Sequence, residues 1–155
     1  MFSSDVMSIL EAGTSLIVGT VGADGEPRAT RAFALTVIDD AAPAVRVVPS
    51  ADDPVVLEHL ATGAIAVTAA DVRTLRSVQL KGRITRVEPS TDDDARMVEE
   101  HSSAFFQAIH DTDGHDLEIS RRLLPLATIS IVMVVDELYD QTPGPGAGGP
   151  VAMSR

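Results

Sequence analysis

The chain has 155 residues, which fits one compact domain, and 45% of them are hydrophobic. Aromatic residues make up only 3%, and the formal net charge is −11. Few stacking rings and a surplus of carboxylates both argue against a nucleic-acid partner. The chain contains no cysteine, which excludes thiol catalysis, disulfides, iron–sulfur clusters and thiolate zinc sites.

Targeting signals are missing from the printed sequence. The opening MFSSDVMSILEAG has neither the basic region nor the apolar run of a signal peptide. No apolar stretch reaches the ~20 residues of a membrane span. We therefore expect a cytoplasmic protein without a membrane partner.

Helices are expected at three places along the chain. The first covers residues 4–12, with Ser4 or Asp5 as its cap. The second follows Asp53, a typical N-cap residue before a proline. The third begins at Pro89-Ser90, where Ser90 and Asp93 resemble a capping box, and fades near residue 110.

Runs of β-forming residues lie between these helices. Asp24-Gly25, between the first run and the second, is a strong hairpin signal. The predicted strands cover residues 15–21, 28–38, 44–49, 64–70, 75–87 and 127–136. Six mostly antiparallel strands with short flanking helices predict a mainly β (α+β) fold, a six-stranded antiparallel split barrel. We expect this domain to cover residues 1–140, followed by a flexible Pro/Gly-rich tail over 141–155.

The fifth predicted strand carries an unusual row of polar side chains. Ser77, Gln79, Lys81, Arg83 and Thr85 alternate with apolar residues, so they share one face. Such a row is often a solvated surface. It is also suited to an anionic or carbonyl-rich ligand.

The order of these motifs resembles the flavin-binding split barrels of the pyridoxamine 5′-phosphate oxidase superfamily. The resemblance covers about residues 5–137. It is carried by the segments SLIVGTVGADGEPRATRAFAL, PVVLEHLATGAIAVTAA and RSVQLKGRITRVEP.

The resemblance implies a homodimer that binds flavin mononucleotide (FMN), or a deazaflavin, at the subunit interface and acts on a small molecule. No side chain in the sequence is a persuasive general acid or base, so the catalytic residues stay unknown. By position, the cofactor-binding residues would be Arg28, Thr30, Arg31, Ser50, Arg76, Ser77, Gln79 and Lys81. The function expected is that of an FMN-dependent oxidoreductase of the pyridoxamine 5′-phosphate oxidase-like type, with an unknown substrate.

One segment departs from that pattern. Many similar proteins place cations after the third strand to bind the flavin phosphate, but this chain has Ala51-Asp52-Asp53-Pro54 there. Arg28, Arg31 or Lys81 could replace the missing cations, the phosphate could bind elsewhere, or the site could lack flavin. The alternatives are a non-catalytic flavin, deazaflavin or haem binding protein, and a cofactor-free dimer. The chain also lacks tryptophan and a basic C-terminal motif, which argues against pyridoxamine phosphate as substrate.

Histidines and acids near the third helix do not predict a metal site. His101 and His110 are nine residues apart, which on a helix places them on opposite sides. The run 111–116 has its glycine at the fourth position, whereas a calcium loop needs it at the sixth.

Overall fold

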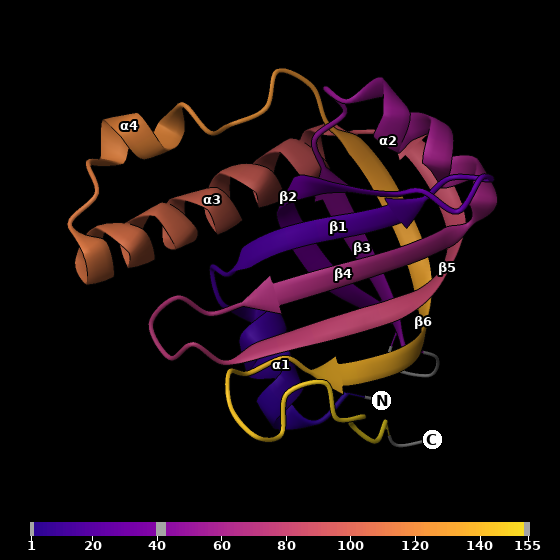
Figure 1. The fold of residues 1–155 in the computed structure, drawn as a ribbon. Coiled ribbons are helices and arrows are strands. Elements are labelled where there is room, and N and C mark those ends of the chain that lie inside the picture. Colours follow the sequence, from indigo (N-terminus) through magenta and orange to yellow (C-terminus); the bar gives the residue numbers. More distant parts are fainter. Residues whose placement is uncertain (1, 40–42, 154–155) are drawn as a thin grey trace.

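Six antiparallel strands close into a barrel in the computed structural model, which describes residues 2–39 and 43–153 (Figure 1). Around the barrel the strands follow the order β1-β2-β3-β6-β5-β4, and β1 pairs with β4 to complete the circle. Their bounds are β1 (Ser15–Val21), β2 (Pro27–Asp39), β3 (Ala44–Pro49), β4 (Ala64–Ala70), β5 (Ser77–Pro89) and β6 (Ile129–Asp140). The six-stranded antiparallel split barrel expected from the sequence is confirmed.

The barrel interior is filled by branched aliphatic side chains. Because successive residues of a strand point to opposite sides, every second residue turns inward. Val18, Val67, Leu80 and Met133 are completely buried there, on four different strands. The intervening residues of these strands face outward.

Two short helical segments close the ends of the barrel (Figure 1). At one end, α1 (Ser4–Glu11) buries Val6, Ile9 and Leu10 against the core. Its cap is Ser3, whose hydroxyl accepts a hydrogen bond from the backbone N–H of Val6, instead of the expected Ser4 or Asp5. At the other end, α2 (Pro54–His59) and the 3₁₀ helix η1 (Leu60–Thr62) add Leu60 to the core.

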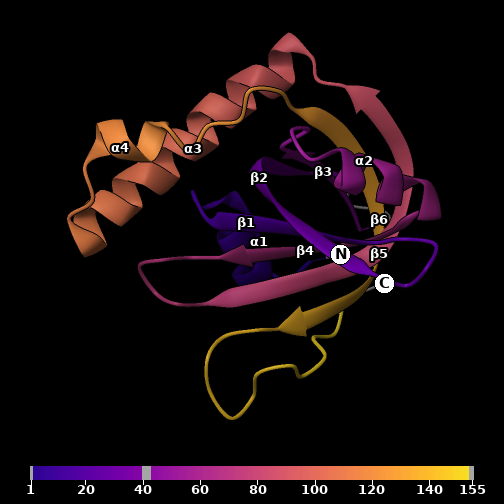
Figure 2. The same ribbon diagram turned by 45° about the horizontal axis from the view of Figure 1, so that its top comes forward.

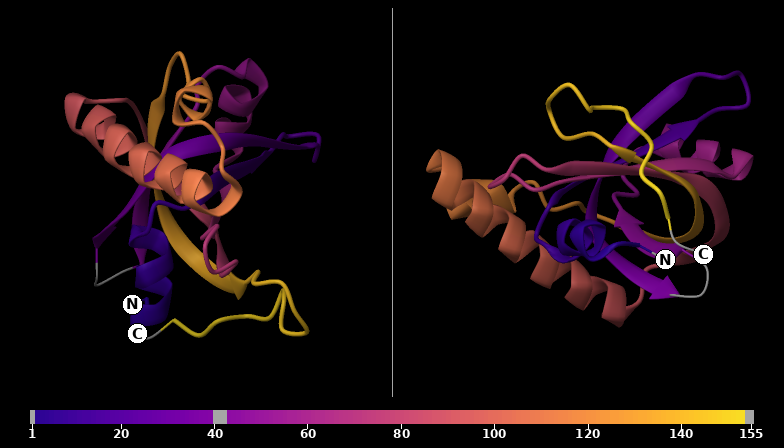
Figure 3. Two further views of the ribbon diagram at one scale, coloured as in Figure 1. Left: turned by 90° about the vertical axis from the view of Figure 1, so that its left-hand side faces the viewer. Right: turned by 90° about the horizontal axis from the view of Figure 1, so that it is seen from below.

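The long helix α3 (Asp92–Asp113) lies along the outside of β2 and extends beyond the barrel (Figure 2). The helix also packs closely against Gly13, which lies between α1 and β1. A Cβ atom added to Gly13 would lie only 2.5 Å from the Cβ of Ala104 on α3. The short helix α4 (Leu117–Arg121) lies beside the far half of α3 (Figure 3). The sequence did not indicate α4.

The predicted start and end of α3 are wrong by a few residues. Thr91 and Asp94 form the capping box in place of Ser90 and Asp93. Asp94 decides where the helix begins, because its side chain is fully buried and also receives a hydrogen bond from Arg46. At the other end, α3 continues to Asp113 and stops at a left-handed Gly114.

After β6, the chain curves back beside the end of that strand. The N–H of Gly148 donates to the carbonyl of Asp140 at 2.7 Å, and the N–H of Val151 donates to Leu138 at 2.8 Å. Val151 and Met153 pack against the core. The flexibility expected of residues 141–155 concerns solution and stays a prediction.

Within residues 2–39 and 43–153, no helix is long and apolar enough to cross a membrane.

Candidate functional site

A single row of side chains crosses five neighbouring strands on the outside of the barrel. Strand pairing aligns Ile17 with Arg31 and Thr68, then Thr68 with Gln79, and Gln79 with Tyr139. Directly paired residues share a face of the sheet. We call the side of β2, β1, β4, β5 and β6 that carries this row the outer sheet face.

The next row on the outer sheet face is made of very small residues in its middle. Ala29, Gly19 and Ala66 are aligned, and Lys81 and Glu137 follow on β5 and β6. A Cβ atom added to Gly19 would still be 4.0 Å from the nearest atoms, which belong to Ala66. The small side chains leave a hollow of about 440 Å³, lined mainly by Gly19, Val21, Ala64, Ala66, Lys81, Asp136 and Glu137.

Lys81 and Glu137 line this hollow, and the polar side chains of the neighbouring row lie beside it on β4, β5 and β6. The Gln79 amide nitrogen donates to the Thr68 hydroxyl at 3.1 Å, so its oxygen remains available to accept. The Lys81 ammonium lies 4.7 Å from the ring centre of Tyr139, a cation–π contact. The Tyr139 hydroxyl donates to Glu137, and this hydrogen bond raises the pKa of the phenol.

Two cations of the outer sheet face lack an acidic partner. Arg31 and Lys81 form no ion pair with any carboxylate in the described part of the chain, whereas Arg83 binds Asp136 through two hydrogen bonds of 2.9 and 3.0 Å. Glu137 stands opposite Lys81 on β6 without forming an ion pair with it. In a chain of net charge −11, cations that form no ion pair on one surface indicate a place for an anion.

The structure brings four of the eight sequence-predicted site residues to the outer sheet face. These are Arg31, Ser77, Gln79 and Lys81. Ser77 is buried there, and its N–H donates to the Thr142 hydroxyl.

The other four predicted residues lie elsewhere. Arg28 and Thr30 are paired with Thr20 and Val18, so they belong to the opposite side of β2, as their spacing from Arg31 predicts. Ser50 is buried after β3, where its hydroxyl accepts from the N–H of Asp52. Arg76 is exposed, 3.9 Å from the carboxylate of Asp5. A role for these residues stays a prediction.

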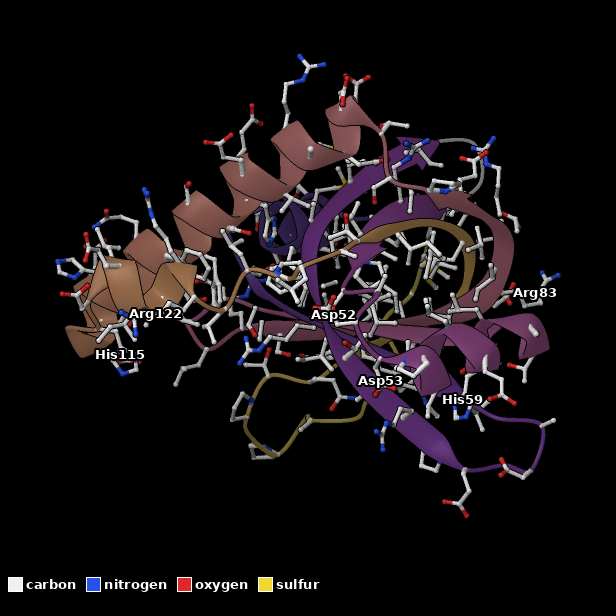
Figure 4. The ribbon with its side chains drawn as sticks, turned by 90° about the horizontal axis from the view of Figure 1, so that it is seen from above. Asp52, Asp53, His59, Arg83, His115 and Arg122 are labelled. Carbon is white, nitrogen blue, oxygen red and sulfur yellow. The ribbon has the colours of Figure 1, made fainter. Side chains whose placement is uncertain are left out.

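Both carboxylates at the start of α2 already have partners in the fold. Asp52 accepts hydrogen bonds from the backbone N–H groups of Leu126 and Ala127, at 3.2 and 3.1 Å. Asp53 caps α2 and binds Arg28 at 2.9 Å (Figure 4). The hydrogen bond from Arg28 lowers the pKa of Asp53, so this carboxylate keeps its negative charge at neutral pH.

Three residues of the outer sheet face were missed by sequence reasoning. Glu137 and Tyr139 lie on β6, which continues four residues beyond the predicted end at Asp136, and Thr68 was passed over within an alanine-rich run. The alternation of DELYD at 136–140 was the signal that could have extended the strand.

The described histidines do not gather around a metal site. No group of three metal-binding side chains occurs in residues 2–39 and 43–153. His101 lies on α3, and its Nε2–H donates to the carbonyl of Thr14 at 2.9 Å. Burial lowers the pKa of its imidazole.

Solved structures with the same architecture were found by comparing folds. HupZ of Group A Streptococcus matches with a TM-score of 0.54 and 14% identity, over 96% of this chain and 100% of that one. A putative pyridoxamine 5′-phosphate oxidase of Lactobacillus delbrueckii matches with 0.54 and 16% identity, over 89% and 93%. An F420 reductase matches with 0.50 and 16%, over 84% and 93%.

The chain has the fold of the pyridoxamine 5′-phosphate oxidase-like split barrels. At identities below 25% this likeness concerns the fold, and the sequence prediction of that fold is confirmed. No protein-family model matches the sequence, and no curated protein is similar to it at a significant level.

Proposed function

We propose that this split barrel is a flavin-dependent oxidoreductase that works as a homodimer and binds FMN or a deazaflavin on the outer sheet face. The observation that carries the proposal is the hollow over Gly19 and Ala66, which Lys81 lines on β5, while Arg31 lies on the same sheet face on β2. A second copy packed over this face would shield the cofactor from water.

The hollow has the shape and chemistry that a flat aromatic ring requires. Glycine and alanine leave the backbone accessible, so a planar group can lie close to β1 and β4. The free oxygen of Gln79 and the ammonium of Lys81 can meet the polar edge of such a ring. These residues fit the ring portion of a flavin.

The anionic end of the cofactor is best met by Arg31. Three strand spacings separate β2 from β5, so Arg31 and Gln79 are about 14 Å apart at their Cα atoms. A ligand of flavin length spans that distance. The start of α2 does not fit a phosphate, because Asp53 is charged there, the Asp52 carboxyl is beside it, and Arg28 is already held by Asp53.

Bound flavin would supply hydride or electron transfer, while the protein determines its orientation and electronic properties. Lys81 would stabilise negative charge on the reduced ring, since its side chain lines the hollow and forms no ion pair with a carboxylate of the described residues. Tyr139 holds Lys81 in place through the cation–π contact. No side chain is assigned as an acid or base, and the substrate is a small molecule that reaches the hollow.

A deazaflavin is the second candidate for the cofactor. The match to an F420 reductase supports it, because F420 is a deazaflavin. Both cofactors combine a planar tricyclic ring with an anionic chain, so Gln79, Lys81 and Arg31 would serve the same purpose for either. The absorbance spectrum of the bound cofactor separates the two.

The purified protein tests this proposal directly. A flavin gives an absorbance band near ~450 nm. Arg31→Ala and Lys81→Ala should each increase cofactor loss on dialysis about tenfold, since each removes a charged contact. Arg86→Ala is the matched control, because Arg86 is an exposed cation of β5 that pairs with Glu88. Equal retention by all four proteins would remove the site from the outer sheet face.

Turnover separates an oxidoreductase from a carrier. Bleaching of the flavin band by a nicotinamide cofactor, followed by reoxidation with an acceptor, supports the enzyme. A cofactor that stays oxidised with every reductant tried supports a binding protein instead. A protein that takes up neither FMN nor F420 supports the cofactor-free dimer.

A further inference from the structure

We propose that the cavity between α3 and the segment 121–128 binds a free α-amino acid with an apolar side chain. The cavity measures about 430 Å³, inside the range of roughly 300–1,000 Å³ that is usual for small-molecule sites. One wall is a stripe of α3, whose lining residues recur every three or four positions and so share a face: Ala95, Val98, Glu99, Ser102, Ser103 and Phe106. The other wall is the segment that leads from α4 into β6.

The body of the cavity is apolar. Val98 and Phe106 on α3 face Leu124 and Pro125 on the opposite wall. Leu124 is 42% exposed, so part of this surface is still open to water. Covering it with an aliphatic or aromatic side chain removes apolar area from water, which favours binding.

A buried hydroxyl in this cavity has no partner. Ser102 is 4% exposed, and its Oγ makes no hydrogen bond in the described structure. A buried polar atom without a partner is destabilising, and native proteins contain few of them. A ligand that accepts a hydrogen bond from Ser102 would satisfy this group.

Two opposite charges line the same cavity without pairing. Glu99 on α3 and Arg121 at the end of α4 both contribute to it, yet neither forms an ion pair with a described residue. Their sequence neighbours Glu100 and Arg122 do not line it. Figure 4 shows Arg122 at the end of α4, away from the barrel.

An α-amino acid carries an ammonium and a carboxylate on one carbon atom. The ammonium can donate to Glu99, and the carboxylate can accept from Arg121 and from the hydroxyl of Ser102. Its side chain would then lie against Val98, Phe106 and Leu124.

This site is independent of the proposed flavin site. None of its lining residues belongs to the outer sheet face. Binding of an amino acid can therefore be measured whether or not a flavin is present, and either proposal can fail alone.

Isothermal titration calorimetry of the full chain with L-leucine tests the inference. We expect L-leucine to bind saturably. L-leucinamide, which lacks the carboxylate, and N-acetyl-L-leucine, which lacks the ammonium, should each bind at least about tenfold more weakly. Arg121→Ala and Glu99→Gln should weaken L-leucine binding by a similar factor. Ser102→Ala should weaken it by about threefold, since it removes one hydrogen bond.

Arg122→Ala and Glu100→Gln are the matched controls, and they should bind L-leucine within about twofold of the unchanged chain. A melting curve for each variant verifies that it is folded. Absence of L-leucine binding at millimolar concentration would overturn the inference. Equal losses of L-leucine affinity in Arg121→Ala and Arg122→Ala would also overturn it. If Arg121→Ala instead changes only the sedimenting mass, the cavity is a contact between copies and the inference is wrong.

Discussion

At Gly82 two strands approach so closely that no side chain can be accommodated. A Cβ atom on this residue would lie 1.9 Å from the carbonyl oxygen of Val134 on β6. Gly82→Ala should therefore lower the free energy of unfolding by at least about 2 kcal/mol, because the backbone of β5 and β6 would have to move. Urea unfolding measures this value.

Gly19→Ala is the control for that substitution. Gly19 is also in a strand, but its added methyl group would meet nothing closer than 4.0 Å. Its unfolding free energy should change by less than about 0.5 kcal/mol. A Gly82→Ala protein as stable as the Gly19→Ala protein would contradict the close approach of β5 and β6.

Asp94 links the start of α3 to the barrel and makes stability depend on pH. Burial acts to raise the pKa of this carboxyl, but hydrogen bonds from Thr91 and Arg46 outweigh it and lower the pKa. The stabilisation by Asp94 is therefore present above the unfolded-state pKa of about 3.9 and is lost as the pH falls through the lower folded-state pKa.

Asp94→Asn should reduce the unfolding free energy at pH 7 by about 3 kcal/mol, because Arg46 loses its buried partner. The variant should also lose less stability than the unchanged chain when the pH is lowered below about 4. Asp93→Asn, at an exposed position of the same helical turn, should change the unfolding free energy by less than about 0.5 kcal/mol, because its ion pair with Arg96 is exposed to water. If the unfolding free energies of Asp94→Asn and the unchanged chain fall in parallel as the pH is lowered, Asp94 is not the source of the pH dependence.

Single residues also show where sequence reasoning reaches its limit. The alternation along β5 correctly predicted that Gln79 and Lys81 face away from the buried Leu80. The partners of Asp52 could not be predicted, because the N–H groups that it binds lie more than seventy residues later, at 126 and 127. Long-range contacts of this kind depend on the closed barrel.

Elements were predicted more reliably than their ends. All six strands were expected, since β-branched runs with period two are separated by clear turn residues. The start of α3 was placed one residue early because Ser90 and Thr91 are both good caps, and tertiary contacts of Asp94 choose between them. The helix α4 was missed because five residues carry too little periodicity.

The segment after β6 allows a test at the scale of elements. In the structure, Val151 and Met153 pack against the core, and the backbone N–H of Gly148 donates a hydrogen bond to Asp140 at the end of β6. Removing residues 141–155 should lower the unfolding free energy by about 2 kcal/mol, if two partly buried apolar side chains are lost. Removing only 154–155 is the control. An unchanged stability after the longer deletion would support the flexible tail that the composition predicts.

The acidic charge of the whole molecule makes the outer sheet face unusual. The face has an apolar centre, where Ile17 is 37% exposed, and unpaired cations at Arg31 and Lys81. An exposed apolar surface of this kind is typical of an interaction site. Two copies that pack through it would bring both sets of cations to the same interface.

Ala66→Arg tests the assembly. Ala66 lies in the middle of the outer sheet face, so a large charged side chain should separate the copies without affecting the core. We expect the sedimenting mass to fall to that of one chain, 16.3 kDa, with the melting curve still cooperative. Val55→Arg, at an exposed apolar position on α2, should leave the mass unchanged. Equal masses for both variants would place the interface elsewhere.

Sedimentation velocity recorded at 280 nm and near ~450 nm tests the central claim in one measurement, since it follows protein and flavin together. Two copies with flavin between them predict that both absorbances move as one boundary, at twice the 16.3 kDa of a single chain. A boundary at 16.3 kDa, or a flavin signal that remains behind the protein, would contradict the account.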